Sequence, residues 1–359
     1  MTETRPVENN TRNPRLDVLR GIAIIAVLFN HADTRTIIGE FGWLGVDLFF
    51  VLSGYLISRL LFVEYKRRKH ISVRRFLWRR SLRIMPAFYG FALVSITYSL
   101  LLEGHSFEIR QILAELLYVQ NYLEGIWVHT WSLGVEEQFY LGFVMLVWLL
   151  AKGRVIEKAV IMIPFWVLAW LSLVWLKFQF VSESQSPEPI FFVETHLRGE
   201  GLLLGVMLGY LQAFFPQKVM IDTPGRWLLF YLSLVAVFAI VPLSMAGYDK
   251  MVSWGLSITN LGFAGLVWLA IQPFELKKSM SKTLVKPLIG MLGWVGIHSY
   301  AIYLWHLNVR GLMRNWFPEQ DMIAGLLYFA LAVLIGWLAT LCIEKPIMKW
   351  RNERWPGIT

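Results

Sequence analysis

Ten apolar stretches recur along the chain, each long enough or nearly long enough to cross a lipid bilayer. A membrane-crossing helix needs about 20 predominantly apolar residues, and stretches of this kind centre on 17–35, 42–62, 84–102, 132–151, 159–178, 198–215, 226–246, 252–271, 288–307 and 322–343. Hydrophobic residues occupy 56% of the 359 positions, too large a fraction for a soluble globular protein. The sequence therefore predicts an all-α integral membrane protein with about ten transmembrane helices.

Connecting segments rich in lysine and arginine predict how these helices are oriented. Such segments favour the cytoplasmic side of a membrane, and here they are 66–83, 152–158, 216–226, 272–286 and 344–354. All of them fall on one side only if the weakly apolar stretch 109–123, which carries Glu115, does not cross. We therefore predict one re-entrant or interfacial segment near 109–123, and N- and C-termini that both lie in the cytoplasm.

The same charge distribution bears on partners and domains. The net charge of +9 is concentrated in connecting segments, so it indicates membrane topology and no nucleic-acid partner. We expect a cytoplasmic polar tail (1–15), a single transmembrane domain (16–345) and a cytoplasmic tail (346–359). The one cysteine, Cys342, excludes an internal disulfide and a cysteine-cluster metal site, and its apolar surroundings predict a buried thiol.

The first apolar stretch carries two side chains that are costly in lipid. The segment LDVLRGIAIIAVLFNH (16–31) places Arg20 and His31 within about 20° of the same helix face and about 16 Å apart along the axis. An ionisable residue inside a span is a functional-site hypothesis by default. The alternative is that Asp17 pairs with Arg20 at the inner interface and that His31 hydrogen-bonds to a neighbouring helix.

Three further spans bring polar side chains to the outer half of the membrane in this topology. Ser132, Glu136 and Tyr140 recur every four residues along one helix face, and Glu137 lies about 100° away. The candidates gathered there are His31, Glu136, Glu137, Arg198, Glu200, Tyr303 and His306. Either interfacial water surrounds the glutamates, or a polar cavity between helices holds at least one of them. Proton-coupled secondary transporters and flippases show the same convergence.

Arginines stand out at two other places. The segment RRFLWRRSLRIMP (74–86) puts Arg79, Arg80 and Arg83 within one helical turn of each other, so a guanidinium cluster suited to phosphate is available at the membrane surface. Anchoring to anionic lipid headgroups is the alternative. Arg310 and Arg314 face outward in this topology, which makes them either a stray exception to the charge rule or a site for an anionic substrate.

Six motifs in this order resemble the membrane O-acyltransferases of acyltransferase family three, which modify bacterial surface glycans and related molecules. They are LDVLRGIAIIAVLFNH, GWLGVDLFFVLSGYLIS, RRFLWRRSLRIMP, TWSLGVEEQFYL, LRGEGLLLG and SYAIYLWH. Gly134 departs from the serine that the family often has. The extracytoplasmic domain frequently fused in the family does not follow in this sequence, so direct transfer to the acceptor is expected.

The resemblance implies a multi-pass protein of the bacterial cytoplasmic (inner) membrane. It would transfer an acyl group, expected to be acetyl, from cytoplasmic acyl-CoA to a hydroxyl of a carbohydrate or lipid-linked sugar, without a metal. It also implies roles for residues of this chain. Arg79, Arg80 and Arg83 would bind the CoA phosphates.

In the same resemblance, His31 would be the general base or a transient acyl-imidazole carrier. Glu136 or Glu137 would orient the imidazole, and Arg20 would steady the oxyanion or hold the CoA portion. The acceptor would contact the remaining candidates, Arg198, Glu200, Tyr303 and His306. A proton-coupled secondary transporter or flippase is the alternative function.

Overall fold

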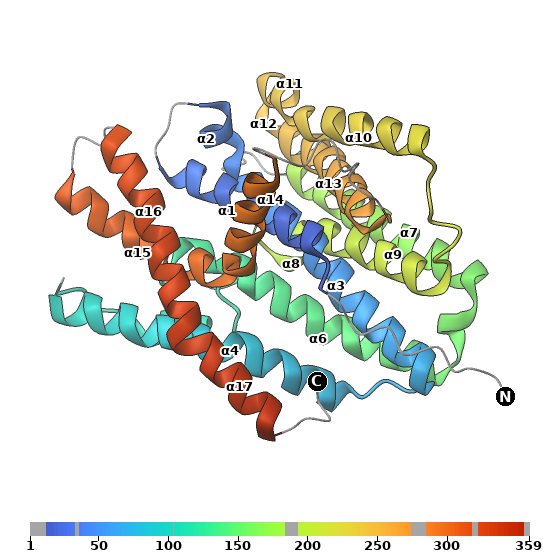
Figure 1. Cartoon of the computed structure of the whole chain (residues 1–359), viewed down its shortest axis with the longest axis horizontal. Coiled ribbons are helices and arrows are strands. Elements are labelled where there is room, and N and C mark those ends of the chain that lie inside the picture. The colour runs from blue at the N-terminus through green and yellow to red at the C-terminus, as the bar shows by residue number, and fades with distance from the viewer. Residues whose placement is uncertain are drawn as a thin grey trace.

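The computed structural model describes residues 12–32, 36–102, 104–183, 193–273, 285–317 and 322–354, and within these ranges it is helical without strands (Figure 1). The all-α prediction is thus confirmed for this part of the chain. The α-helices are α1 (Pro14–His31), α2 (Ile37–Phe41), α3 (Gly45–Arg68), α4 (Val73–Leu102), α5 (Ile109–Leu116), α6 (Trp131–Lys152), α7 (Ala159–Glu183), α8 (Thr195–Arg198), α9 (Glu200–Phe214), α10 (Thr223–Phe238), α11 (Ile240–Met245), α12 (Tyr248–Lys250), α13 (Leu256–Ile271), α14 (Val285–Ile297), α15 (Ser299–Trp316), α16 (Met322–Ala339) and α17 (Lys345–Arg354). Short 3₁₀ turns (η1, Gly42–Leu44; η2, Val128–Thr130; η3, Val155–Glu157) and π-helical turns (η5, Met251–Gly255; η7, Thr340–Glu344) join some of them.

Seven of the described helical segments are long and apolar enough to cross a membrane, and an eighth is possible if a bent pair crosses as one unit. The seven are Ile37–Arg68, Val73–Leu102, Val128–Lys152, Ala159–Glu183, Thr223–Met245, Tyr248–Ile271 and Ile323–Arg354. Two of the ten predicted spans fall short on their own. Helix α1 carries Arg15, Asp17 and Arg20, and α9 has only 15 residues. Both pack against α3, so neighbouring helices cover them at these positions.

Glycines explain how the short helix α9 is held inside the bundle. Gly201, Gly205 and Gly209 recur every four residues along α9, on the face that packs against α3. A Cβ atom at Gly205 would lie 2.2 Å from the carbonyl oxygen of Val51. Small residues let helix backbones approach closely in membranes, where van der Waals packing drives association. Any larger side chain on this face would force α3 and α9 apart.

The predicted span 288–307 is not one straight helix. Helix α14 packs along α1 and ends at Ile297, and α15 begins at Ser299 after a bend of 76°. At His298 the backbone amide donates to the carbonyl oxygen of Val295, three residues back, and Nδ1 donates to the carbonyl oxygen of Trp294 at 2.8 Å. This tighter local bonding redirects the chain, so α15 runs beside α16 on one side of the molecule (Figure 1).

The prediction made from charge for 109–123 and the prediction made from hydropathy for Cys342 have different outcomes. The stretch 109–123 contains only the eight-residue helix α5, which at about 12 Å is far too short to cross. The prediction that Cys342 is buried is wrong, because its side chain is exposed on η7. An apolar run in a membrane protein faces lipid as well as the core, so hydropathy does not separate the two. The helical segment Ile323–Arg354 continues beyond η7 through α17, which packs on α4.

Candidate active site

Three histidines from distant parts of the chain form one cluster. His31 ends α1, His306 lies on α15, and His129 lies in η2 just before α6. The ring centroid of His306 is 4.9 Å from that of His31 and 5.1 Å from that of His129. His31 is half-buried, whereas His129 and His306 are buried. The sequence singled out His31 and His306 but not His129, although His129 directly precedes the TWSLGVEEQFYL motif.

Backbone carbonyl groups fix which nitrogen of each ring carries the proton. Nδ1 of His31 donates to the carbonyl oxygen of Val27 at 2.9 Å, and Nδ1 of His306 donates to that of Tyr303 at 2.6 Å. Nε2 of His129 donates to the carbonyl oxygen of Leu304 at 3.1 Å. A carbonyl oxygen only accepts hydrogen bonds. The lone pair of each neutral ring is therefore on the other nitrogen, which is Nε2 in His31 and His306 and Nδ1 in His129.

Glu115 on α5 holds the turn that carries His129. Its Oε1 accepts from the backbone amides of Ile126 and Trp127 at 2.9 and 3.2 Å and from the hydroxyl of Thr130 at 2.9 Å. The hydroxyl of Tyr303 donates to the carbonyl oxygen of His129 at 2.6 Å. A carboxylate that bonds several amides of one turn fixes its shape. The segment that does not cross the membrane therefore positions one of the three histidines.

Burial raises the pKa of Glu115 to about 7, although its hydrogen bonds oppose the shift. Because the folded state then binds this proton more tightly than the unfolded state, the free energy of unfolding falls as pH rises from about 4.5 to about 7. The loss amounts to about 3 kcal/mol. Glu115→Gln stays uncharged and is expected to remove most of this dependence. Melting temperatures of the detergent-solubilised protein at about pH 5 and about pH 8 measure it.

The matched control is Glu124→Gln, since Glu124 is an exposed carboxylate in the following loop. It should leave the pH dependence of the melting temperature as it is in the wild type. An equal pH dependence in Glu115→Gln and the wild type would contradict the assignment.

A second cluster joins α3, α4 and α6 around Arg80. Its Nη2 donates to Glu136 at 3.2 Å and its Nε donates to Glu137 at 3.1 Å. The guanidinium carbon lies 3.6 Å from the ring centroid of Tyr140. Glu136 also accepts from Ser53 at 2.9 Å and from the Tyr140 hydroxyl at 3.0 Å. The structure thus places both glutamates on Arg80, where the resemblance implied that one of them orients His31.

The other arginines assigned to CoA phosphates lie in different surroundings. Arg83 is exposed and interacts electrostatically with Arg20, Arg80 and Glu344. Arg79 is half-buried and has Arg75 and Arg351 as charged neighbours. Arg20 forms an ion pair with Asp17 at 3.3 Å. Arg83 is therefore the exposed member of a positive cluster that includes Arg20 and Arg80.

Arg198 and Glu200, assigned to the acceptor, lie in a buried network of ion pairs. Arg198 pairs with Asp47 at 2.8 Å, and Glu200 pairs with Lys177 at 2.6 Å. Ser257 connects the second pair, because its hydroxyl accepts from Lys177 at 2.9 Å and donates to Glu200 at 2.8 Å. Asp47 and Lys177 were not predicted from the sequence as the partners of these two residues. In these contacts Arg198 and Glu200 each neutralise a buried side chain of opposite charge.

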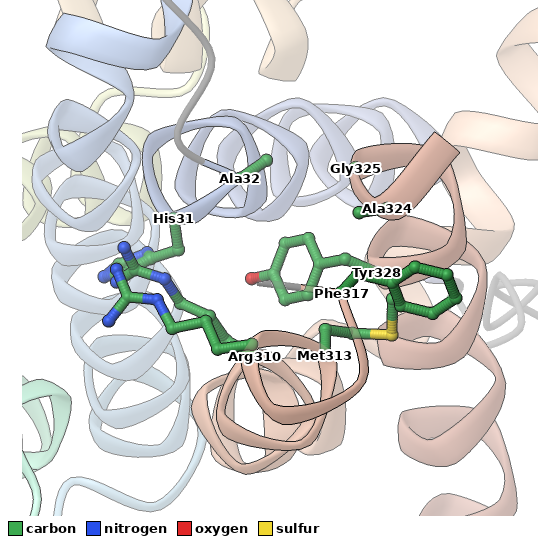
Figure 2. Close-up of a pocket in the computed structure, with 9 residues that line it drawn as sticks. His31, Ala32, Arg310, Met313, Phe317, Ala324, Gly325 and Tyr328 are labelled. Carbon is green, nitrogen blue, oxygen red and sulfur yellow. The ribbon is translucent and has the colours of Figure 1, made fainter. Parts of the chain in front are cut away.

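A small pocket, partly open to solvent, lies beside His31 between α15 and α16 (Figure 2). Its lining residues include His31, Arg310, Met313, Arg314, Phe317 and Tyr328. Figure 2 shows His31 and the Arg310 side chain on one side of the pocket and Met313 and Phe317 on the other. Across the described ranges, no group of three or more His, Cys, Asp or Glu side chains has the arrangement of a metal site. The lining of the pocket thus includes an imidazole and two guanidinium groups.

Comparison with known proteins gives consistent matches. The profile described as an acyltransferase domain matches residues 13–341. A Staphylococcus aureus protein, named provisionally as an O-acetyltransferase, is 30% identical over 382 residues, which cover 96% of this chain and 59% of that protein. The peptidoglycan O-acetyltransferase OatA of Listeria monocytogenes is 28% identical over 363 residues, covering 94% and 56% of the two chains. The O-acetyltransferase OatA of S. aureus is 29% identical over 365 residues, covering 94% and 57%.

The chain spans less than three fifths of the length of these curated relatives. No solved structure gives a significant match.

Proposed function

This chain belongs to the acyltransferase domain family, and on that premise we propose that it transfers an acetyl group from acetyl-CoA to a hydroxyl of a cell-envelope carbohydrate. The relatives named as O-acetyltransferases support the reaction type, and one of them is named for peptidoglycan. The observation that carries the proposal is His31, whose proton is held on Nδ1 by a backbone carbonyl while its ring lines the pocket. This arrangement gives Nε2 of His31 the lone pair that a general base needs.

In the proposed reaction, Nε2 of His31 takes the proton of the acceptor hydroxyl as its oxygen attacks the thioester carbonyl. A C–O bond forms, the C–S bond breaks, and the CoA thiolate leaves with the proton that His31 took. A transient acyl-imidazole, in which Nε2 itself attacks the thioester, would use the same nitrogen. In both routes the tautomer fixed by Val27 is the reactive one.

His306 gives His31 a neutral neighbour. Once His31 is protonated, an acceptor for its Nε2–H group would stabilise the charge. The ring of His306 is adjacent to that of His31, and its Nε2 carries a lone pair that could serve as this acceptor. Nε2 of His306 and Nδ1 of His129 are buried and have no hydrogen-bond partner among the described residues. A buried acceptor without a partner is costly. We propose that these two rings stabilise the imidazolium that forms when His31 takes up the proton. The resemblance implied a glutamate as the partner of His31.

The donor would reach His31 from the end of the bundle that carries Arg83. Arg20 and His31 are eleven residues apart on α1, or about 16 Å, and Arg83 interacts electrostatically with Arg20. Phosphates bound at the exposed Arg83 would leave the thioester to extend past Arg20 toward His31. In the proposed topology this end faces the cytoplasm of a bacterial inner membrane, and the pocket beside His31 faces outward.

Arg83→Ala is expected to raise the KM for acetyl-CoA by about tenfold or more while kcat changes little, because a charge-assisted hydrogen bond contributes about 1.5 to 3 kcal/mol. Saturating acetyl-CoA should then restore most of the rate. Arg74→Ala is the control, since Arg74 is exposed on the first turn of the same helix. An unchanged KM in Arg83→Ala would assign Arg83 to the lipid surface instead of the donor.

The function itself is tested with the purified chain in lipid nanodiscs and acetyl-CoA that carries a labelled acetyl group. We expect label to move to carbohydrate extracted from the host envelope, and free CoA to accumulate in equal amount. Mass spectrometry of surface glycans from a deletion strain should show the loss of acetyl groups. Protein that neither consumes acetyl-CoA nor alters glycan acetylation would overturn the proposal.

A further inference from the structure

The turn η2, which carries His129, lies close to a buried arginine from another part of the chain. Trp131 begins α6 two residues after His129, and the guanidinium carbon of Arg198 lies 5.1 Å from its ring centroid. Arg198 also interacts electrostatically with Tyr303, whose hydroxyl donates to the carbonyl oxygen of His129 at 2.6 Å. Arg198 therefore meets two side chains that flank or contact this turn.

The position of Arg198 is itself fixed. Its Nη2 donates to Asp47, in the first turn of α3, at 2.8 Å. Its guanidinium carbon also lies 5.8 Å from the ring centroid of Trp43, so the group is within cation–π distance of two indole rings. Nε of Arg198 has no hydrogen-bond partner among the described residues. One carboxylate and two rings thus determine where the guanidinium group lies.

The packing of α8 on α6 does not depend on the charge of Arg198 alone. One turn earlier, the hydroxyl of Thr195 donates to the side-chain oxygen of Gln138 at 2.6 Å and connects the same two helices. A buried ion pair can also often be replaced without loss of stability, whereas conformational specificity is a documented use of buried ionic groups. The aromatic contacts of Arg198 favour such a use here.

We propose that Arg198 is a positioning residue, which acts through Trp131 to hold the turn that carries His129. The imidazole of His129 then stays beside that of His306. The inference rests on the proposed function, in which His129 helps to stabilise the imidazolium that forms on His31. It gives Arg198 a role other than the contact with the acceptor that the resemblance implied.

The first test measures the kinetics of a double variant, Asp47→Asn with Arg198→Met, which removes the ion pair without leaving one charge unpaired. Because misplacing a group by about 1 Å can cost about 10²-fold in rate, kcat for acetyl transfer should fall about tenfold or more. The KM for acetyl-CoA should stay within about twofold of the wild type, since the donor is proposed to bind at Arg83. The melting temperature shows whether the variant has folded.

Two tryptophan variants separate positioning from general packing. Trp131→Leu keeps the ion pair and should lower kcat as the double variant does, so it tests the same connection if the double variant does not fold. Trp43→Leu is the matched control, because Trp43 lies near the same guanidinium group but does not adjoin His129. Its kcat should equal that of the wild type. Adding Trp131→Leu to the double variant should lower kcat no further, because residues that act through one another are not additive.

NMR of protein with isotope-labelled histidine, in lipid nanodiscs, follows His129 directly. Its two ring nitrogens should give separate signals, because Nε2 donates to the carbonyl oxygen of Leu304 and Nδ1 carries the lone pair. His129→Gln assigns these signals by removing them. The double variant and Trp131→Leu should each shift the signals or merge them through tautomer exchange, and Trp43→Leu should leave them unchanged.

Unchanged His129 signals in the double variant overturn the inference, whatever happens to kcat. An unchanged kcat in a well-folded double variant overturns it as well, since Arg198 would then hold the turn without serving the reaction. An equal loss of kcat in Trp43→Leu and Trp131→Leu would assign both rings to packing and would also overturn it. Wild-type protein that transfers no acetyl group would remove the proposed function, and the histidine signals alone would then decide whether Arg198 positions His129.

Discussion

Replacing His31 by alanine is expected to lower the rate of acetyl transfer by about 10² to 10⁴, the usual effect of removing a general base. The loss should appear in kcat, because the proposed mechanism binds the donor at the Arg83 end of the bundle and uses His31 only in the transfer step. His31 is half-buried at the last turn of α1, so its truncation removes little packing. Labelled product per amount of protein measures the effect, and the melting temperature reports whether the variant has folded.

His70→Ala is the matched control, since His70 is exposed in the connection between α3 and α4. It should retain the wild-type rate. A well-folded His31→Ala protein that makes product within a few-fold of the wild type would exclude His31 as base and as acyl carrier. The tautomer fixed by Val27 would then have no catalytic meaning, and His129 and His306 would be the remaining imidazoles of the cluster.

Hydropathy predicted where the helices are, because a long apolar stretch in lipid has to satisfy its own backbone groups. It did not predict the bend at His298, where a single residue changes the bonding inside an apolar run. It also did not show that α9 is short and surrounded, since its glycines matter only through their contacts with α3. A hydropathy average over about 20 residues shows neither the bend at His298 nor the packing of α9 against α3.

Helical periodicity and the charge rule predict the face and the depth of a side chain but not its partner. His31 and His306 were expected in the same half of the membrane, and their rings lie 4.9 Å apart. Glu136 and Glu137 were expected beside them, yet both contact Arg80 from a segment assigned to the membrane surface. The rotation of α4 against α6 decides that pairing, and rotation is set by packing between distant segments.

The position of His129 is even harder to predict from local sequence. It lies outside the apolar stretch of its own span, in a 3₁₀ turn. Its position depends on Glu115 and Tyr303, which come from two other parts of the chain. Local sequence contains the histidine but neither of the contacts that bring it to the cluster.

Arg80→Ala is expected to destabilise the protein by about 3 to 5 kcal/mol, because it leaves Glu136 and Glu137 without their cation in a largely buried site. Only 12% of the Arg80 side chain and 15% of each glutamate side chain are exposed. The variant should yield less folded protein and melt at a lower temperature. Arg83→Ala, by contrast, should change the KM for acetyl-CoA without a comparable loss of stability.

Neutralising the glutamates provides the decisive comparison. If unpaired carboxylates cause the destabilisation, the triple variant Arg80→Met, Glu136→Gln, Glu137→Gln should regain much of the melting temperature lost in Arg80→Ala. Arg80→Lys should be intermediate, since an ammonium group keeps the charge but lacks the fork that reaches both carboxylates. An Arg80→Ala protein that is as stable as the wild type and has a raised KM for acetyl-CoA would instead make Arg80 a donor ligand. The glutamates would then have to release Arg80 when CoA binds, and one of them would become available to a neighbouring imidazole.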